Sequence, residues 1–414
     1  TSMKGTLEAL RGGGRGVSAD TKKTRLRRAL IVFEVALAMI LLAGAGLLGR
    51  SFVALHQVDP GFRPDGVTAM RVALSSTRYR EPAARVEFTD RLLERLRALP
   101  GIRAAGAVHS LPVAGLPSSS GFTIEGMPVT DPANEPSAEI RMVAGDYFSA
   151  MGIPLVRGRV FERTDVAGPA RAFVIDETLA KRHFGTTDPI GRRITVEWGV
   201  PMPGTVVGVV GPVRQRSLAG PYLPTVYFWN AQETAPALEF VVRGSGSPET
   251  MERLLTQQVR ALDPEQVVAE IRPLGDAVAG QVAGRRVVLT LVGFFASVAL
   301  LLAALGLYGV ISHSVVQRTR EIGIRLALGA TRRSVGAMVV RQGLTLTGLG
   351  LLAGIATVLA LGRLLAGSLF GVPSWDPVSI AVAAGFLLAV ALFASWLPAR
   401  RALRTDPVTA LRLE

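Results

Sequence analysis

The residue types that most often carry catalysis or bind metals are few in this chain and widely separated. None of the 414 residues is a cysteine, so a thiol nucleophile, a disulfide and a thiolate metal site are all excluded. The four histidines lie far apart, at His56, His109, His183 and His313, and no His-Glu-x-x-His motif occurs. A Gly-x-Ser-x-Gly nucleophile motif is also absent. The sequence therefore predicts no catalytic residue and no metal site, and we expect a protein that is not an enzyme.

A nucleotide-binding loop is equally absent. After Lys23 the only lysine is Lys181, which follows no glycine-rich turn. A P-loop needs a lysine that reaches the β- and γ-phosphates, so this chain cannot itself be a P-loop ATPase. The glycine-rich run at Gly12–Gly16 is more typical of a flexible linker, and the carboxylates of Asp176 and Glu177 are more typical of a helix cap and a first helical turn. We therefore expect no cofactor-binding residue in the chain.

What the chain does contain is four long, nearly uncharged apolar runs. A helix rises ~1.5 Å per residue, so about 20 apolar residues cross a hydrocarbon core of ~30 Å. A buried helix of a soluble core is the alternative for one such run, but four of them indicate a membrane protein. The predicted transmembrane helices are residues 29–49, 287–311, 342–362 and 377–397.

The long stretch between the first two spans, residues 50–286, predicts a folded α+β domain. Strands such as Val67–Leu74 alternate with amphipathic helices, including Pro82–Leu99 and Pro248–Leu262, and Pro/Gly-rich turns separate them. This domain carries 27 Arg and Lys against 25 Asp and Glu, so the formal net charge of +14 comes from segments beside the spans. That distribution indicates membrane topology, and we expect membrane lipid and no nucleic acid as a partner.

Basic residues near the span ends predict the orientation. Residues 1–28 carry eight, the 312–341 connection six and the 398–414 tail four, whereas the loop between the last two spans carries only Arg363. Cytoplasmic segments next to membrane spans are enriched in Lys and Arg. We therefore expect both termini and the 312–341 connection in the cytoplasm, and the large domain outside it.

The 312–341 connection contains the run QRTREIGIRLALGA, which predicts a short amphipathic helix after the second span. Ile322 and Leu326 lie one turn apart, as do Ile324 and Leu328, and Glu321 can pair with Arg325 at i,i+4. Such a helix could press on a cytoplasmic partner as a lever, or it could lie on the lipid headgroups.

Three further features concern the membrane segments. Glu34 lies inside the first span and is either functional or paired with a basic group at the nearby interface. Gly350 and Gly354 form a Gly-x-x-x-Gly signal for close helix packing. Residues 1–28, rich in Gly, Ser and basic residues, are expected to be a flexible cytoplasmic linker.

Several motifs together resemble one family. They are QRTREIGIRLALGA (317–330), DYFSAMGIPLVRGRVF (146–161), VIDETLAKRHFGTTDPIGRRI (174–194), VVGVVGPVRQRSL (206–218) and PARRALRTDPVTAL (398–411). With the order of one span, a large external domain and three more spans, the chain resembles the MacB/FtsX/LolC-type ABC transporter permeases. The opening of the chain is similar to the midpoint of the long, duplicated acidobacterial-type members, so we expect the C-terminal half of such a protein; a stand-alone four-span permease is the alternative.

The resemblance implies a fold and a function. The fold is an α-helical membrane protein of four transmembrane helices, with a large extracytoplasmic α+β domain (a MacB-like periplasmic core) inserted between helices 1 and 2. The function is that of a non-catalytic permease in the bacterial inner (plasma) membrane, paired with a second permease half and with a separate cytoplasmic ABC ATPase that binds the ATP. Closure of that ATPase would move the external domain for export or efflux of a substrate. An FtsX-like scaffold that regulates an extracytoplasmic hydrolase, or a lipoprotein-releasing permease, is the alternative.

The resemblance also implies which residues face the ATPase. They belong to the helix after the second span, and we expect them to be Arg318, Arg320, Glu321, Ile322, Arg325 and Leu326.

Overall fold

The computed structural model describes residues 4–127, 136–166, 171–328, 330–365, 370–373 and 375–402. The chain divides into two compact units. One comprises Thr1–Gln57 together with Arg285–Glu414, and the other comprises Val58–Gly284.

The first unit is helical. Its helices are α1 (Lys4–His56), α6 (Leu274–Gln317, which begins in the second unit), α7 (Thr319–Ala327), α8 (Arg332–Leu365) and α9 (Pro377–Ala402). Four helical segments of the described chain are long and apolar enough to cross a membrane: Arg25–His56, Ala283–Gln317, Arg332–Gly362 and Pro377–Arg401. Each contains one predicted span, and the helix of the third begins ten residues before the predicted start at 342. Thr331 explains that earlier start, because its Oγ1 accepts a hydrogen bond from the Ser334 amide (3.3 Å) and caps α8.

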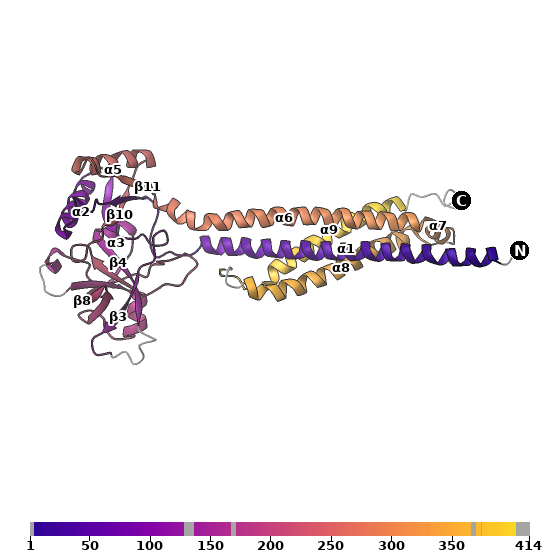
Figure 1. Cartoon of the computed structure of the whole chain (residues 1–414), viewed down its shortest axis with the longest axis horizontal. Helices are drawn as coiled ribbons and strands as arrows, with labels where there is room; N and C mark the ends of the chain where they lie inside the picture. Colours follow the sequence, from indigo (N-terminus) through magenta and orange to yellow (C-terminus); the bar gives the residue numbers. More distant parts are fainter. Residues whose placement is uncertain are drawn as a thin grey trace. The chain divides into compact units, whose positions relative to one another are not determined.

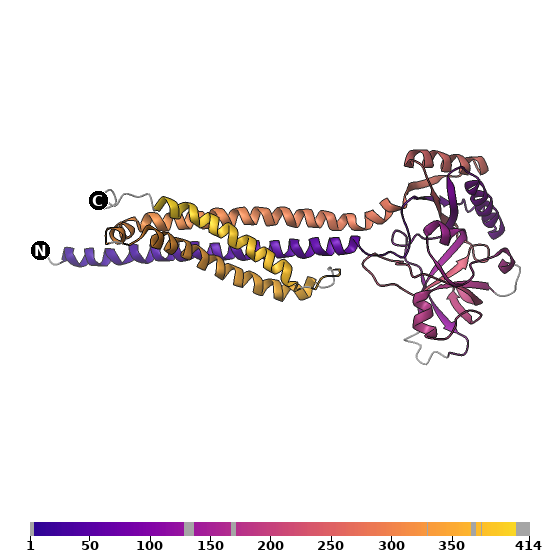
Figure 2. The ribbon, with the colours of Figure 1, turned by 180° about the vertical axis from the view of Figure 1, so that it is seen from behind.

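Helix α8 packs against both α1 and α9 (Figure 2). The buried positions are small or aliphatic, such as Ala38 and Ala43 of α1 and Ala391 of α9. Small side chains let helix backbones approach closely, and in lipid this van der Waals packing holds helices together. Large apolar side chains on the other faces, among them Phe294 and Leu302 of α6, are exposed, as expected for surfaces that meet lipid tails.

The prediction that residues 1–28 form a flexible linker is wrong, because α1 is helical from Lys4 onward. Once the span has nucleated a helix, each further residue adds one hydrogen bond. The helix therefore continues through a segment whose glycines disfavour it by ~1 kcal/mol each.

Polar contacts tie the helices of this unit together. Arg50 of α1 forms an ion pair with Asp376 (2.5 Å), whose Oδ2 also accepts from the backbone N–H and the hydroxyl of Ser379 and so caps α9. Arg401 of α9 donates to the hydroxyl of Tyr308 of α6 (2.6 Å). These bonds connect α1 to α9 and α9 to α6.

The second unit is a mixed α/β domain around one sheet. Its elements, in chain order, are β1 (Val67–Ala73), α2 (Pro82–Arg97), β2 (Ile102–Val108), β3 (Ser119–Ile124), β4 (Ser137–Gly145), α3 (Tyr147–Met151), β5 (Leu155–Gly158), β6 (Arg171–Asp176), α4 (Glu177–Leu179), β7 (Arg193–Trp198), β8 (Val200–Val210), β9 (Thr225–Trp229), β10 (Ala237–Gly244), α5 (Pro248–Leu262) and β11 (Val268–Pro273). Short 3₁₀ and π-helical turns lie at Arg163–Val166 and Ala180–Phe184.

The strands run in the order β11-β1-β10-β2-β4-β3-β7-β8-β6-β9, and β5 pairs with β8. A parallel pairing of β4 with β9 joins the end of that path back to its middle, so β4, β3, β7, β8, β6 and β9 form a closed ring. From β4, strands β2, β10, β1 and β11 continue as an open antiparallel sheet, over which α2 and α5 lie in contact with each other (Figure 1). The domain therefore has two parts, a helix-covered sheet and a strand ring, which share β4.

The local sequence explains the elements. In α2, Phe88, Leu92, Leu93 and Leu96 share one buried stripe at helical spacing. Helix α5 begins and ends where the sequence predicts, because Ser247 caps it by accepting from the Thr250 amide (3.3 Å) and Pro248 occupies the first turn. The predicted fold class, four membrane helices with an α+β domain between the first two, is confirmed.

Candidate functional site: the helix between the second and third spans

Helix α7 follows α6 after a single residue, Arg318. Helical backbone hydrogen bonds continue through this residue. The Arg318 amide donates to the Ser314 carbonyl (3.2 Å), and the Ile322 amide donates to the Arg318 carbonyl (2.9 Å). At the other end the Ala330 amide donates to the Arg325 carbonyl (2.9 Å), and the cap of α8 follows at Thr331. Gly329, which follows Leu328, lies outside the described residues. Short, hydrogen-bonded connections thus join α7 to the helices on either side.

The two sides of α7 differ in exposure. Ile322 is 4% exposed, whereas Ile324 is 44% and Leu328 is 82% exposed. Glu321 and Arg325, which form an ion pair (2.6 Å), are each about half exposed. Residues 321, 324, 325 and 328 follow the i, i+3, i+4, i+7 spacing of one helix face. This exposed face of α7, defined by Glu321, Ile324, Arg325 and Leu328, combines two apolar side chains with one ion pair.

One expectation from the sequence is therefore corrected. Ile322 was placed on the face that meets a partner, but it is buried and helps to hold α7 in place. The side chains of Arg320 and Leu326 lie outside the described residues, while Arg318 is exposed. The sequence predicts two apolar pairs at i,i+4, and the packing of α7 buries Ile322 and leaves Ile324 and Leu328 exposed.

A further contact fixes α7 against α8. The guanidinium Nη1 of Arg325 donates to the sulfur of Met338 (3.2 Å), while its Nη2 holds Glu321. An exposed ion pair of this kind is worth only ~0.3–0.5 kcal/mol in a helix. It therefore orients the charged edge of the exposed face without deciding whether the helix folds.

The packing glycines predicted in α8 lie against α1. A Cβ on Gly350 would lie 2.6 Å from Val35 Cβ, and one on Gly354 would lie 2.7 Å from Met39 Cβ. Real carbon atoms do not approach so closely, so the absence of both side chains allows the α1 and α8 backbones to meet.

Glu34 lies in a notch of α6. A Cβ at Gly306 would lie 2.5 Å from Glu34 Oε2, so the carboxylate occupies space that a side chain at Gly306 would need. This oxygen is buried and has no hydrogen-bond partner among the described residues. The ion pairs described for this chain do not join Glu34 to a basic group, so pairing at the interface has no counterpart in this structure.

The extracytoplasmic domain holds its own buried polar cluster. Arg141 and Glu139 are both buried and paired (3.2 Å), Glu139 also binds Arg216 (2.7 Å), and Arg141 donates to Gln215 (2.9 Å). Burial lowers the pKa of His109 to about 4, and the positive charge of Arg141 adds to that effect. A buried ion pair of this kind is retained where its hydrogen bonds are satisfied, so we assign the cluster to the domain core.

Asp176 caps α4 as the sequence predicts. Its Oδ1 accepts from the amides of Leu179 (2.9 Å) and Thr225 (2.8 Å). Complete burial raises its pKa to about 6, against the lowering effect of those two hydrogen bonds. A carboxylate with no exposed surface cannot contact a substrate. We therefore attribute its raised pKa to its structural role as a helix cap.

Comparison with known families agrees with this architecture. Residues 29–279 match the MacB-like periplasmic core domain, and residues 293–407 match the FtsX-like permease C-terminal region. The chain belongs to the family of ABC transporter permeases that combine these two parts. It is a multi-pass membrane protein with a mixed α/β domain between its first and second spans, as predicted.

Among known relatives, the chain is 27% identical over 429 residues to the macrolide export ATP-binding/permease protein MacB of Azoarcus sp. (strain BH72), which covers 100% of this chain and 60% of that protein. It is 26% identical over 340 residues to the ABC transporter permease YknZ of Bacillus subtilis (strain 168), covering 80% of this chain and 81% of YknZ. The chain thus spans only part of the MacB relative.

Solved structures of related domains are also similar. The periplasmic region of MacB from Actinobacillus actinomycetemcomitans matches 54% of this chain and 95% of that domain, with a TM-score of 0.36 and 16% sequence identity.

Proposed function

We propose that this chain is the permease part of an exporting ABC transporter of the inner membrane, and that a separate cytoplasmic ATPase docks on the exposed face of α7. The observation that carries the proposal is the pair Ile324 and Leu328, which stay exposed on a short helix fixed between two membrane helices. An apolar pair with a charged edge suits a protein groove, where burial gives affinity and the charges set the register. Membership in the permease family supports an ATPase as the occupant.

The proposed mechanism is mechanotransmission, in which movement of α7 reaches the extracytoplasmic domain through helices. Helix α6 supports it, because it is one helix from Leu274 to Gln317 and begins directly after β11, which ends at Pro273. Strand β11 pairs with β1 in the sheet, so this connection is hydrogen-bonded into the domain. In this proposal the termini and α7 lie in the cytoplasm, and a second permease half completes the transporter.

Residues 59–65, through which the chain enters the domain after α1, are also hydrogen-bonded to it. Arg243 of β10 donates to the carbonyls of Ala150 (2.8 Å), Arg63 (2.7 Å) and Asp65 (2.9 Å). Tyr222 donates to the Asp59 carbonyl (2.8 Å). Hydrogen bonds from a charged donor are about twice as strong as neutral ones, so in this proposal a displacement of Arg63 and Asp65 reaches β10 through Arg243.

The test compares alanine variants of α7 in a pull-down of the tagged full chain from its own host membranes. Ile324→Ala and Leu328→Ala should insert normally and lose most of the co-purifying ABC-type ATPase, mainly through faster dissociation. Val316→Ala is the matched control, because Val316 is an exposed apolar residue at the end of α6. Undiminished ATPase recovery with both α7 variants would place the docking site elsewhere and leave α7 as a membrane-surface helix.

A further inference from the structure

The extracytoplasmic domain contains a cleft that neither the fold nor the proposed coupling explains. It has a volume of ≈ 530 Å³ and lies between α2 and the strand ring. The parallel pairing of β4 with β9 creates it, because that pairing places Trp229 opposite Val143, with the Asn230 amide bonded to the Val143 carbonyl (2.8 Å). Residues from distant parts of the sequence meet there, and four of them, Asp146, Phe148, Val160 and Phe161, belong to the motif at 146–161.

One wall of the cleft is aromatic. The rings of Phe161 and Trp229 are stacked, 6.1 Å apart and 15° from parallel, and Phe148 lies 6.5 Å from Phe161. Trp229 and Phe161 are half-buried, and Val160 is exposed beside them. The flat faces of such rings attract both apolar groups and cations.

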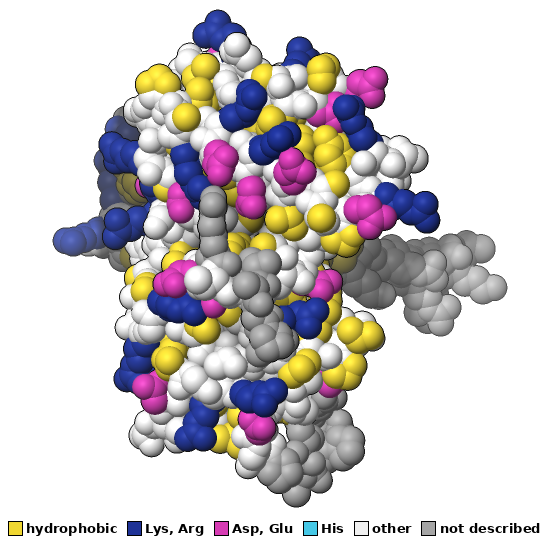
Figure 3. Space-filling view, turned by 90° about the vertical axis from the view of Figure 1, so that its left-hand side faces the viewer, with side chains coloured by type: hydrophobic (Ala, Val, Ile, Leu, Met, Phe, Trp, Pro, Cys, Tyr) yellow, Lys and Arg dark blue, Asp and Glu magenta, His cyan; other side chains and the backbone are white. Residues whose placement is uncertain are grey.

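The opposite wall is the side of α2 that carries Val86, Asp90 and Glu94, four residues apart along the helix. Both carboxylates make further contacts within the protein, and a carboxylate has acceptor sites for more than one donor. On the face shown in Figure 3, acidic side chains lie among both hydrophobic and basic ones. The lining thus pairs negative charge with an aromatic surface.

The floor of the cleft is fixed by an ion pair and a glycine. Arg97 Nε binds Asp146 Oδ2 (2.7 Å), which satisfies both charges within the wall. Gly145 has a φ of +60°, and a Cβ there would lie 2.6 Å from Arg97 and 2.8 Å from Leu93. Glycine therefore allows both the backbone turn and the approach of Arg97, and it keeps the floor free of a side chain.

The cleft continues into a groove of ≈ 690 Å³ that shares Val86, Asp90, Glu94 and Ala231 with it. The groove adds Glu87, which is paired with Arg91 (3.2 Å), and Glu233, which lies 3.7 Å from Arg171. Sites for small organic ligands typically measure ~300–1,000 Å³ and combine an apolar wall with a few polar groups. The cleft and its groove have that size and that composition.

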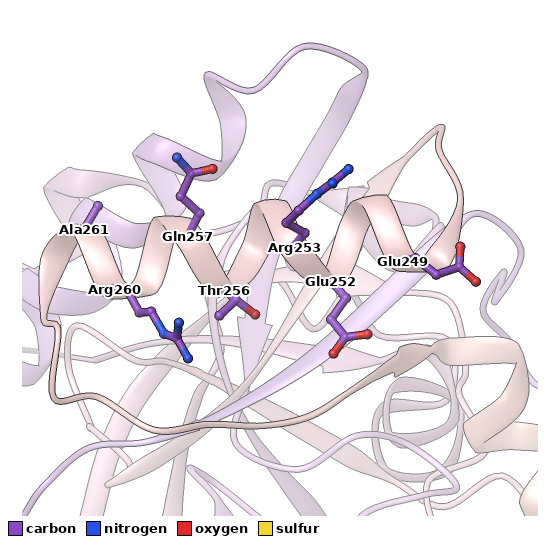
Figure 4. Close-up of a pocket in the computed structure, with 7 residues that line it drawn as sticks. All are labelled: Glu249, Glu252, Arg253, Thr256, Gln257, Arg260 and Ala261. Atoms are coloured by element: carbon purple, nitrogen blue, oxygen red, sulfur yellow. The ribbon is translucent and has the colours of Figure 1, made fainter.

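Another hollow, of ≈ 650 Å³ along α5, lacks these properties (Figure 4). Its described lining comes from that single helix, with Glu249, Glu252, Arg253 and Arg260 along it, and Ala261 is the only apolar member. It offers no aromatic wall among those residues, so it provides a control surface for the cleft.

We propose that the cleft between α2 and the Phe161–Trp229 stack binds an organic cation with an apolar or aromatic body. The cationic group lies between the carboxylates of Asp90 and Glu94 and the face of Trp229, and the apolar body fills the space toward Val86, Val160 and Phe161. This inference goes beyond the proposed export function, because the site can take its ligand whether the protein transports that ligand or senses it.

The test measures binding of ethidium to the purified full chain in nanodiscs by fluorescence anisotropy, without an ATPase. We expect saturable binding that tetraphenylphosphonium displaces and that tetraphenylborate, an anion of similar size and shape, does not. A cation–π contact is worth ~0.5–2 kcal/mol, so Trp229→Leu should weaken binding about tenfold, while Trp229→Phe stays close to the unchanged chain. The double variant Asp90→Asn/Glu94→Gln should weaken binding and remove the preference for the cation over the anion.

The matched control is Glu252→Gln on α5, which should bind as the unchanged chain does. No saturable binding, equal displacement by the anion, or full binding by both Trp229→Leu and the acid double variant would overturn the proposal. Because the ATPase is absent from this experiment, its failure leaves the proposed docking on α7 standing. Loss of ATPase docking would in turn leave the cleft unaffected.

Discussion

Asp176 provides a test of how the extracytoplasmic domain responds to pH. Its carboxyl is fully buried, and its pKa rises from 3.8 to about 6 because burial disfavours the charged form. In the unfolded chain the same group ionises near 3.8, so between about pH 4 and 6 the unfolded state gives up a proton that the folded state keeps. The contribution of Asp176 to stability is therefore fully present below pH 4 and is lost as the pH rises through 6.

The size of this effect follows from the pKa. A tenfold change in a protonation equilibrium corresponds to ~1.4 kcal/mol, so ionisation of Asp176 costs about 3 kcal/mol of stability at pH 7.5. Asp176→Asn removes the titration and keeps an oxygen that accepts from Leu179 and Thr225. Thr178 also lowers the pKa of Asp176 through its hydroxyl and its amide, and a hydroxyl can rotate to accept a hydrogen bond from the new amide nitrogen.

The assay is hydrogen exchange of β6 and β9 amides in the full chain, comparing Asp176→Asn with the unchanged protein at each pH. The difference in the free energy of unfolding, variant minus unchanged protein, should rise by about 3 kcal/mol between pH 4 and 7.5. His109 has the opposite effect, because its pKa of about 4 makes the domain less stable as pH falls from about 6.5 toward 4. Both proteins contain His109, so its contribution cancels when their stabilities are subtracted. If the free energies of unfolding of the two proteins change with pH in the same way, the raised pKa of Asp176 is refuted.

Two predictions concern the membrane unit. Gly354→Ala places a Cβ 2.7 Å from Met39 and should destabilise the bundle by ~1–3 kcal/mol, measured by steric trapping of the unfolded state in bilayers. Gly348→Ala is its control, because a Cβ there meets no atom within 4 Å and alanine favours the helix by ~1 kcal/mol. Ile322→Ala should loosen α7 by ~2–5 kcal/mol, seen as faster exchange of α7 amides, whereas Leu328→Ala should leave that exchange unchanged. Equal effects of the two α7 variants on exchange would contradict the assignment of their faces.

Much of the architecture follows from local sequence. The apolar runs locate the membrane helices because every backbone group in lipid must be bonded within its own segment. Helix α5 is equally local, since a cap at Ser247 and a proline at Pro248 define its start. The glycines at 350 and 354 were identifiable for a similar reason, because their spacing alone places them on one side of a helix.

Other features depend on contacts between distant residues. The outward side of α7 depends on burial in the folded chain, which hides Ile322 and exposes Ile324. The cleft needs Trp229, Phe161 and Glu94, which come together only because β9 pairs in parallel with β4. A parallel pairing of residues 86 positions apart, such as Val143 with Trp229, leaves no short-range signal.

The most direct test of the proposed coupling is cross-linking from single cysteines, which the absence of native cysteine makes clean. Leu328→Cys and Ile324→Cys, treated with a short thiol–amine cross-linker in native membranes, should each capture an ABC-type ATPase, with a yield that changes when ATP is added. Leu302→Cys, on the exposed apolar face of α6, should capture none. Capture of an ATPase from Leu302→Cys but from neither α7 position would contradict the account.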